Sequence, residues 1–266
     1  MKYLFISKYF SYNGIYSKDI LENQDLIIAR SDTGLIEQRM GVSRQIRKEK
    51  IKDRVMPYSY GVDEEVITFP IQIIKNKPWT YDERGKICEW LQTKTYEEFI
   101  SDDDINIVYK CKTVGEPIFR NTSRDEGFAE FVFECDAPHA WSKADNQYFN
   151  LPNNTTSTTI QIYNNSNFYH DYKPEIEVEL LGTDTGFKLV NLSDNNREFE
   201  FTNLAEGETV YIDNDKENII SDLSSDTYRL GNLTDKRFFR LKKGINQVEV
   251  YGKVNIHIRS QFPLMV

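Results

Sequence analysis

Alternation of apolar and polar residues is the dominant pattern along this chain. Residues 175–180 read Glu-Ile-Glu-Val-Glu-Leu, and the longest run, Val248–Ile258, places valines and isoleucines at every second position except Gly252. Successive side chains of a strand point to opposite faces, so this period of two predicts strands with one buried face. The same pattern predicts further strands at Val66–Ile74, Ile105–Cys111, Phe128–Cys135, Thr159–Tyr163, Glu198–Thr202 and Thr209–Asp213.

Turn residues separate these runs at short intervals. Gly182–Gly186 lies between two apolar runs and predicts a hairpin connection, and Asp213-Asn214-Asp215 and Lys243-Gly244 predict further turns. Many short strands with frequent turns are typical of β-sandwiches and argue against a parallel α/β fold.

One helix is predicted after Thr80. Thr80–Glu83 has the pattern of a capping box, in which the threonine side chain caps the amide of the glutamate and the glutamate reaches back. Ile87, Trp90 and Leu91 follow at helical spacing and form a short apolar stripe, which we expect to anchor the helix on a sheet. A weaker form of the capping pattern recurs at Thr95–Glu98.

A domain boundary is predicted between Asp136 and Asn154. A strong strand pattern ends there, Pro138 and Pro152 interrupt the chain, and a polar stretch follows. The length of 266 residues also suits two domains. We therefore predict a first domain at residues 1–139 and a second at residues 140–266.

Composition narrows the class of protein. Aromatic residues make up 13% of the chain, which favours strands and large buried contacts. No apolar run is as long as a membrane-spanning helix needs, and the first residues lack the pattern of a signal peptide, so we expect no membrane protein. The net charge is −9, and both halves are acidic, which argues against a nucleic-acid-binding domain.

Residue types that carry chemistry are few and scattered. The three cysteines, Cys88, Cys111 and Cys135, have no metal-binding spacing, and we interpret them as reduced, buried residues. Nucleophile, zinc-protease and phosphate-loop motifs are missing from the sequence. Asp102–Asp104 and Asp213–Glu217 match calcium loops only in part, and solvated turns explain them better. We therefore predict no catalytic, cofactor-binding or metal-binding residues.

The segment Arg39–Arg54 is the most polarised part of the chain, with a net charge of +5 in an otherwise acidic protein. Aromatic residues are not interleaved with the cations, which disfavours nucleic-acid contact. Two interpretations stay open, namely a solvated arm and a contact with an acidic surface such as a neighbouring copy of the chain. The candidate interface residues are Arg39, Arg44, Arg47, Lys48, Lys50, Lys52 and Arg54.

The order of several structural motifs resembles that of a known family. They are Pro57–Glu65, Glu89-Trp90-Leu91, Phe131–Pro138 with Trp141-Ser142, Tyr172–Ile176, Phe201–Leu204, Val210–Asp213 and Lys243–Asn246. Together they are similar to the distal tail proteins of siphophages, the bacteriophages with long, non-contractile tails, and of related prophages. The resemblance covers nearly the whole chain.

The resemblance implies a mainly β fold. Its first part would be an N-terminal β-sandwich with one helix and a protruding hairpin arm, followed by a C-terminal galectin-like, jelly-roll sandwich. It also implies a structural virion protein of the phage tail tip, made in the bacterial host cytoplasm. Six copies would form a homohexameric ring joining the tail tube protein to the tail-tip hub protein of the baseplate and to receptor-binding proteins. DNA would pass through the ring without specific binding, and the protein would contact no membrane.

Two other functions stay open at this point. A carbohydrate-binding module would fit a lectin-like second domain, but Trp79, Trp90 and Trp141 all lie outside the predicted second sandwich. The aromatic candidates there are tyrosine and phenylalanine residues such as Phe168 and Tyr169. A phage wall hydrolase would need an acid and a nucleophile or metal that the sequence does not reveal.

Overall fold

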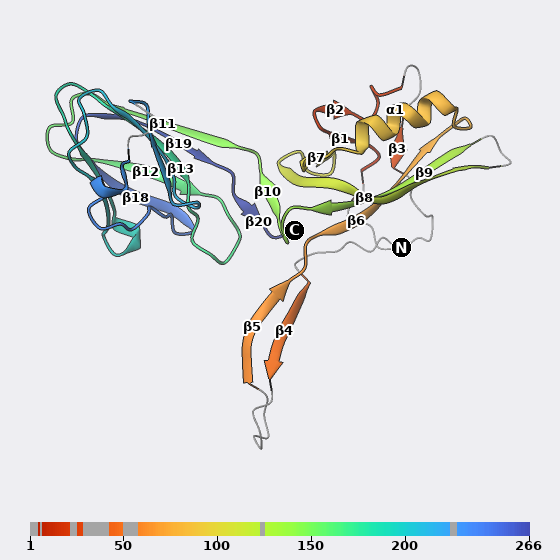
Figure 1. The fold of residues 1–266 in the computed structure, drawn as a ribbon, viewed down its shortest axis with the longest axis horizontal. Coiled ribbons are helices and arrows are strands. Elements are labelled where there is room, and N and C mark those ends of the chain that lie inside the picture. Colours follow the sequence, from red (N-terminus) through yellow and green to blue (C-terminus); the bar gives the residue numbers. More distant parts are fainter. Residues whose placement is uncertain are drawn as a thin grey trace. The chain divides into compact units, whose positions relative to one another are not determined.

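A computed structural model describes residues 5, 7–21, 26–28, 43–49, 58–122, 126–223 and 228–266. The chain divides into two compact units, the first formed by Met1–Ser142 with Leu264–Val266 and the second by Lys143–Pro263. The mainly β fold with one α-helix and two domains is confirmed for the described residues (Figure 1).

The first domain is built on one antiparallel sheet of nine strands. Its main path runs β2-β1-β7-β8-β9-β6-β3, and β10 pairs with both β8 and β20. The strands are β1 (Phe10–Tyr12), β2 (Ile15–Tyr16), β3 (Ile27–Ile28), β6 (Thr68–Lys75), β7 (Glu97–Ser101), β8 (Ile107–Asn121), β9 (Gly127–Cys135), β10 (Ala140–Ser142) and β20 (Pro263–Leu264). The last strand brings the chain end back to this domain, where Val266 packs against the core.

Alternation along β6 and β9 builds the first core. Every second residue of both strands is buried, and Phe69 lies opposite Phe133 in the register. Their rings stack at 5.6 Å, and Phe99 of β7 joins them at 5.5 Å from Phe69 and 5.6 Å from Phe133. Aromatic packing of this kind contributes beyond the buried area alone.

The helix α1 (Tyr81–Leu91) begins at the predicted capping box. The Glu83 amide donates to Thr80 Oγ1 at 3.3 Å, and the Thr80 amide donates to Glu83 Oε2 at 2.8 Å. The weaker capping pattern at Thr95–Glu98 does not begin a helix, because β7 starts at Glu97 and pairs with β8. Tertiary pairing overrides the local signal there.

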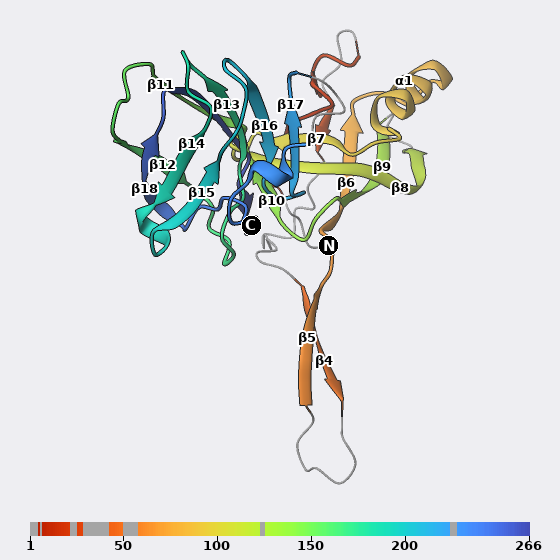
Figure 2. The same cartoon turned by 60° about the vertical axis from the view of Figure 1, so that its left-hand side comes forward.

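The second domain is a sandwich of two antiparallel sheets (Figure 2). The five-stranded sheet has the order β11-β19-β13-β16-β17, with β11 (Asp145–Leu151), β13 (Glu175–Leu180), β16 (Thr209–Asp213), β17 (Asn218–Ser221) and β19 (Val254–Ser260). The four-stranded sheet has the order β12-β18-β14-β15, with β12 (Thr158–Asn164), β14 (Phe187–Asn191), β15 (Arg197–Phe201) and β18 (Gly244–Tyr251). Two short 3-10 helices, η1 (Leu192–Asp194) and η2 (Leu230–Asn232), lie in the connections.

Two sequence predictions for this domain are wrong. The run Val248–Ile258 is divided between β18 and β19, which belong to different sheets, because Gly252 adopts φ +97° and turns the chain. The alternation continues across the turn because both strands bury their even-numbered residues between the two sheets. Gly182–Gly186 is likewise no hairpin, because it connects β13 in one sheet to β14 in the other.

The strands β4 (Arg44–Glu49) and β5 (Tyr58–Glu64) form a separate two-stranded antiparallel sheet. Arg44 lies opposite Glu64 and Arg47 opposite Gly61, with a register shift after Arg47. Both views show this ribbon as a hairpin distinct from the nine-stranded sheet (Figures 1 and 2). The predicted hairpin arm is therefore present.

Candidate functional site

Three of the predicted interface residues lie on the described part of the arm. Arg44, Arg47 and Lys48 are all on β4, and all six residues of that strand are exposed. The other four candidates, Arg39, Lys50, Lys52 and Arg54, lie outside the described residues.

The second strand of the arm neutralises much of this positive charge. Arg44 Nε lies 3.1 Å from Glu64 Oε1, and Arg47 Nε lies 2.5 Å from Asp63 Oδ2. The hydrogen bond with Asp63 raises the pKa of Arg47. Within the described part of the chain, Lys48 has no acidic partner. The two arginines therefore serve the hairpin itself, and Lys48 is the described cation of β4 available for another surface.

The three predicted helix anchors are buried against the first core. Ile87 and Leu91 have no exposed surface, and Trp90 is 4% exposed. The Trp90 indole donates to the Tyr12 carbonyl at 2.9 Å, and its ring stacks on Phe10 at 5.4 Å. Trp90 therefore holds the helix against β1, and all three side chains belong to the core of the first domain.

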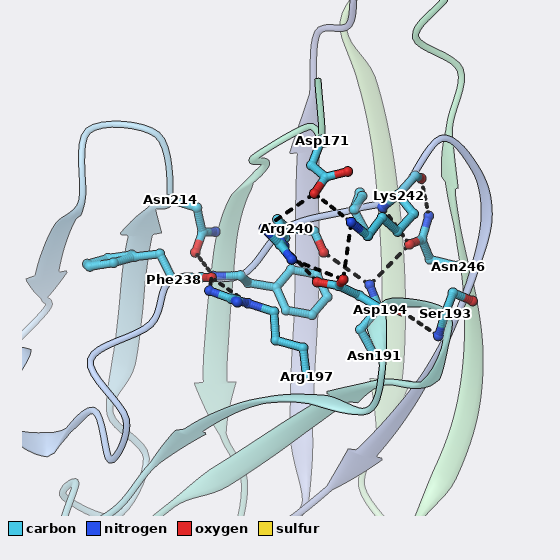
Figure 3. A network of polar contacts seen from close by, with 12 residues as sticks. Asp171, Asn191, Ser193, Asp194, Arg197, Asn214, Phe238, Arg240, Lys242 and Asn246 are labelled. Atoms are coloured by element: carbon cyan, nitrogen blue, oxygen red, sulfur yellow. Dashed lines mark hydrogen bonds and ion pairs between the residues drawn. The ribbon is translucent and has the colours of Figure 1, made fainter. Parts of the chain in front are cut away.

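A network of buried asparagines holds the segment 238–242, which precedes β18 (Figure 3). Asn246 accepts from the Lys242 amide at 2.8 Å and donates to the Lys242 carbonyl at 2.7 Å. Asn191 donates to the Arg240 carbonyl at 3.0 Å, and Asn214 accepts from the Phe239 amide at 2.8 Å. The side chains thus supply partners for backbone groups that no strand pairs.

An ionic cluster closes the same segment. Asp194 is 1% exposed and accepts from Arg240 Nε at 2.6 Å, while Lys242 Nζ lies 3.2 Å from its other oxygen. The hydrogen bond from Arg240 outweighs burial and lowers the pKa of Asp194. Asp171 binds Lys242 at 2.8 Å and completes the cluster. Because the charges are paired with one another, we assign the cluster to folding.

The outer face of the five-stranded sheet differs from that network. Five residues, one from each strand, are successive partners across the sheet and form a continuous row, which we term the central row. The central row consists of Tyr148, His257, Glu177, Tyr211 and Ile220. Tyr148 stacks on His257 with ring centroids 4.2 Å apart and planes at 11°, and His257 Nδ1 lies 3.4 Å from Glu177 Oε2.

Two open hollows lie along the central row and share Glu177 and His257. The first has a volume of about 360 Å³ and the second about 340 Å³, at the small end of the range for ligand pockets. The first is lined by Glu175, Ile176, Glu177, Tyr211, Ile212, Asp213, Asn218, Ile220, His257 and Arg259. The second is lined by Tyr148, Phe149, Asn150, Glu177, Glu179, Asn255, Ile256 and His257.

Sequence reasoning missed this face because its residues are distant in the chain. Tyr148 lies in β11, within the stretch interpreted as a polar boundary, although Asn146, Tyr148 and Asn150 alternate with more buried residues there. The aromatic candidates named from the sequence lie elsewhere, with Phe168 buried and Tyr169 55% exposed. The sequence signal for β11 is short, because only Phe149 and Leu151 among its inward residues are apolar.

The other residues of metal-binding or nucleophilic type do not form a site among the described residues. Over the described ranges, no group of three or more histidine, cysteine or acidic side chains could hold a metal ion. Cys111 and Cys135 are buried free thiols opposite one another on β8 and β9. In Asp213–Glu217, Asp213 caps its own turn, but Asn214 is fully buried, so that turn is only partly solvated. No described helix is long and apolar enough to cross a bilayer.

Comparison with solved structures finds the same two-domain fold. The crystal structure of the Dit protein (gp 19.1) of phage SPP1, described as a paradigm of the hub adsorption apparatus in phages that infect Gram-positive bacteria, matches with a TM-score of 0.66. The match covers 96% of this chain and 98% of that chain at 11% identity, so it shows a shared fold. A chain of the activated phage P2 baseplate with calcium matches over the same shares at 9% identity and a TM-score of 0.46.

Comparison with curated proteins gave no match. Family models, in contrast, cover both domains. A model described as a phage tail protein N-terminal domain matches residues 5–137, and one described as a phage tail C-terminal domain matches residues 139–260. Because the first model alone spans half of the chain and the second spans most of the remainder, the chain belongs to this family of phage tail proteins.

Proposed function

We propose that this phage tail protein is a distal tail protein, a structural hub at the tail tip. The observation that carries the proposal is the likeness to the SPP1 Dit structure, which extends through both domains and covers 98% of that chain. Six copies form a closed ring that joins the tail tube to the tail-tip hub protein and the receptor-binding apparatus, and DNA passes through its channel. A cyclic ring repeats one heterologous contact between neighbours.

The arm is the proposed source of that contact. Each subunit carries a net charge of −9, so assembly needs local complementarity between neighbouring surfaces. Lys48 is exposed and takes part in neither of the ion pairs that Arg44 and Arg47 form with β5. In this proposal it acts together with Arg39, Lys50, Lys52 and Arg54 of the same basic segment. In the proposed ring these residues contact an acidic surface of the next subunit.

Solution mass tests the ring directly. A closed ring of six 31.3 kDa chains has a mass of about 188 kDa, which light scattering coupled to size exclusion can measure. A mass of 31.3 kDa at every concentration would contradict a ring that closes by itself.

Charge reversal then tests the arm. Lys48→Glu should shift the assembly toward monomers without breaking an ion pair of the hairpin, and Lys86→Glu on the exposed face of α1 is the matched control. The triple reversal of Arg44, Arg47 and Lys48 to glutamate should have a larger effect, but it also removes both cross-strand pairs. Rising salt should weaken the wild-type ring, because the Debye length falls from ~10 Å at 0.1 M to ~3 Å at 1 M. A ring unaffected by Lys48→Glu would show that the arm is only solvated.

The proposed role is structural and involves no catalysis. A turbidity assay with purified peptidoglycan separates it from a wall hydrolase. We expect no clearing at any protein concentration, and clearing that follows the intact chain through purification would contradict a purely structural role.

A further inference from the structure

The central row combines exposed aromatic surface with acceptor groups on one rigid face. Tyr148 is 70% exposed, Tyr211 43% and Ile220 52%, and all three lie on the outer face of the second domain. We propose that this face binds a neutral saccharide, with a sugar ring on Tyr148 and a neighbouring ring over Tyr211 and Ile220.

Tyr148 provides a flat stacking surface. One face of its ring lies on His257 at 4.2 Å, and its exposure leaves the opposite face open to solvent. The two C–H faces of a pyranose ring are apolar, and covering an aromatic ring with one of them removes apolar area from water. The His257 stack fixes the orientation of the tyrosine before a ligand arrives, which lowers the ordering cost of binding.

The carboxylates beside the row provide hydrogen-bond acceptors. An ionised carboxylate accepts at about four positions and donates at none, so it suits a ligand rich in hydroxyl donors. Glu177 has His257 as its hydrogen-bonding partner among the described residues, at 3.4 Å, and Glu179 accepts from Asn255 at 2.8 Å. Both carboxylates line the second hollow and keep acceptor positions for a ligand.

The charge of the face selects among polymers. Glu175, Glu177 and Asp213 line the first hollow against Arg259, so the lining has more acids than permanent cations. An anionic chain such as a polyol phosphate or a nucleic acid would be repelled, because such binding needs clustered lysine and arginine. Neutral saccharides avoid that repulsion and still satisfy the carboxylates.

The scaffold suits a preorganised site. The residues of the central row stand on five hydrogen-bonded strands, and β19 and β13 pair over their full facing lengths. Sites built on strands hold their side chains more precisely than sites on loops. A saccharide could therefore bind without remodelling the sheet.

The test uses the full-length protein and defined probes. Saturation-transfer NMR and calorimetric titration with tetrasaccharides of N-acetylglucosamine, glucose and galactose measure binding, and glycerol phosphate oligomers are the anionic comparison. We expect at least one neutral tetrasaccharide to bind and the anionic oligomer not to bind. Tyr148→Ala should weaken the binding by about tenfold, the size expected for loss of one stacking contact.

Matched variants make the result specific. Tyr211→Ala should weaken binding, whereas Tyr163→Ala should not, because Tyr163 is equally exposed at 44% but lies on the other sheet, in β12. Tyr148→Phe keeps the ring and should retain binding. All these side chains are exposed, so a thermal melt should show unchanged folding.

Failure of any central expectation overturns the proposal. It is wrong if no neutral tetrasaccharide binds, if the anionic oligomer binds instead, or if Tyr148→Ala and Tyr163→Ala behave alike. None of these outcomes changes the mass of the assembled chain, so they are distinguishable from a failure of the proposed ring.

Discussion

The two domains are stabilised by different kinds of interior. In the first, about half of the described core residues are aromatic, and the rings of Phe10, Phe69, Phe99 and Phe133 pack together in one cluster. In the second, most core residues are aliphatic, and ten of the thirteen buried polar side chains of the described residues lie there. Five of those ten are asparagines: Asn154, Asn164, Asn191, Asn214 and Asn246.

The difference follows from how the strands are connected. β6 to β9 of the first domain pair with neighbours, so their backbone groups bind one another. The second domain has irregular connections between its sheets, including the segment 238–242, whose backbone groups must find other partners. Asn191 donates to the Arg240 carbonyl at 3.0 Å, and Asn214 accepts from the Phe239 amide at 2.8 Å. Buried asparagines thus replace missing strand partners.

Separating the domains should change the molecule most. We expect residues 143–263 alone to unfold cooperatively near the second-domain transition of the full chain, since their core cluster contains no first-domain residue. Residues 1–142 alone should melt below their transition in the full chain, because they lose the pairing of β10 with β20 and the packing of Val266. Calorimetry of the three proteins checks both expectations, and a non-cooperative 143–263 fragment would contradict independent domains.

Trp90→Ala should cost about 3–5 kcal/mol of the unfolding free energy of the first domain, as expected for removing a buried indole. The variant loses the stack on Phe10 and leaves the Tyr12 carbonyl without its donor. Denaturant unfolding followed by circular dichroism measures the change, and Trp90→Phe should recover part of it. An unchanged first transition would show that the aromatic cluster does not hold the helix.

Glu83→Gln should cost about 2–3 kcal/mol, because it leaves a buried ammonium without its counter-charge. Lys75 is 1% exposed and lies 2.5 Å from Glu83 Oε2. Burial raises the pKa of Glu83, but hydrogen bonds from Lys75 and Thr80 outweigh it and lower the pKa from 4.5 to about 2.

The pH dependence separates this pair from ordinary packing. The stability that Glu83 contributes is present above pH 4.5 and is lost as the pH falls toward 2, because the unfolded state takes up the proton first. Wild-type stability should therefore fall more steeply than that of Glu83→Gln over this window in acid titrations of unfolding. Lys75→Met combined with Glu83→Gln should recover part of the loss, and parallel pH curves would disprove the pairing.

Asn246→Ala should cost about 1–3 kcal/mol and affect only the second domain, since it leaves buried amide and carbonyl groups of Lys242 unpaired. Hydrogen exchange should show faster exchange at the Lys242 amide. Asn153→Ala, on an exposed turn, is the control and should leave that exchange unchanged. Equal effects on both transitions would contradict the separation of the two interiors.

Local patterns sufficed for much of the fold. The alternation at 175–180 predicts β13 with the bounds that the structure has, and Thr80–Glu83 with Ile87, Trp90 and Leu91 predicts α1. These signals work because a strand and a capped helix each impose a short period on the residues that they bury. The extension of β8 to Asn121 was missed because its register shifts between Val114 and Ile118, where Gly115 adopts φ +72°.

The sequence by itself determined which residues turn inward along strands such as β6, β9 and β13, the α-helix that follows Thr80, and the family of phage tail proteins that the chain resembles. Only the tertiary structure decided which strands share a sheet, because pairing depends on contacts between residues far apart in the chain. It divided Val248–Ile258 at Gly252, placed Asp63 and Glu64 against the arginines of the arm, and brought Tyr148 beside His257. A period of two records that a side chain faces inward or outward, but it carries no information about the neighbour that it meets.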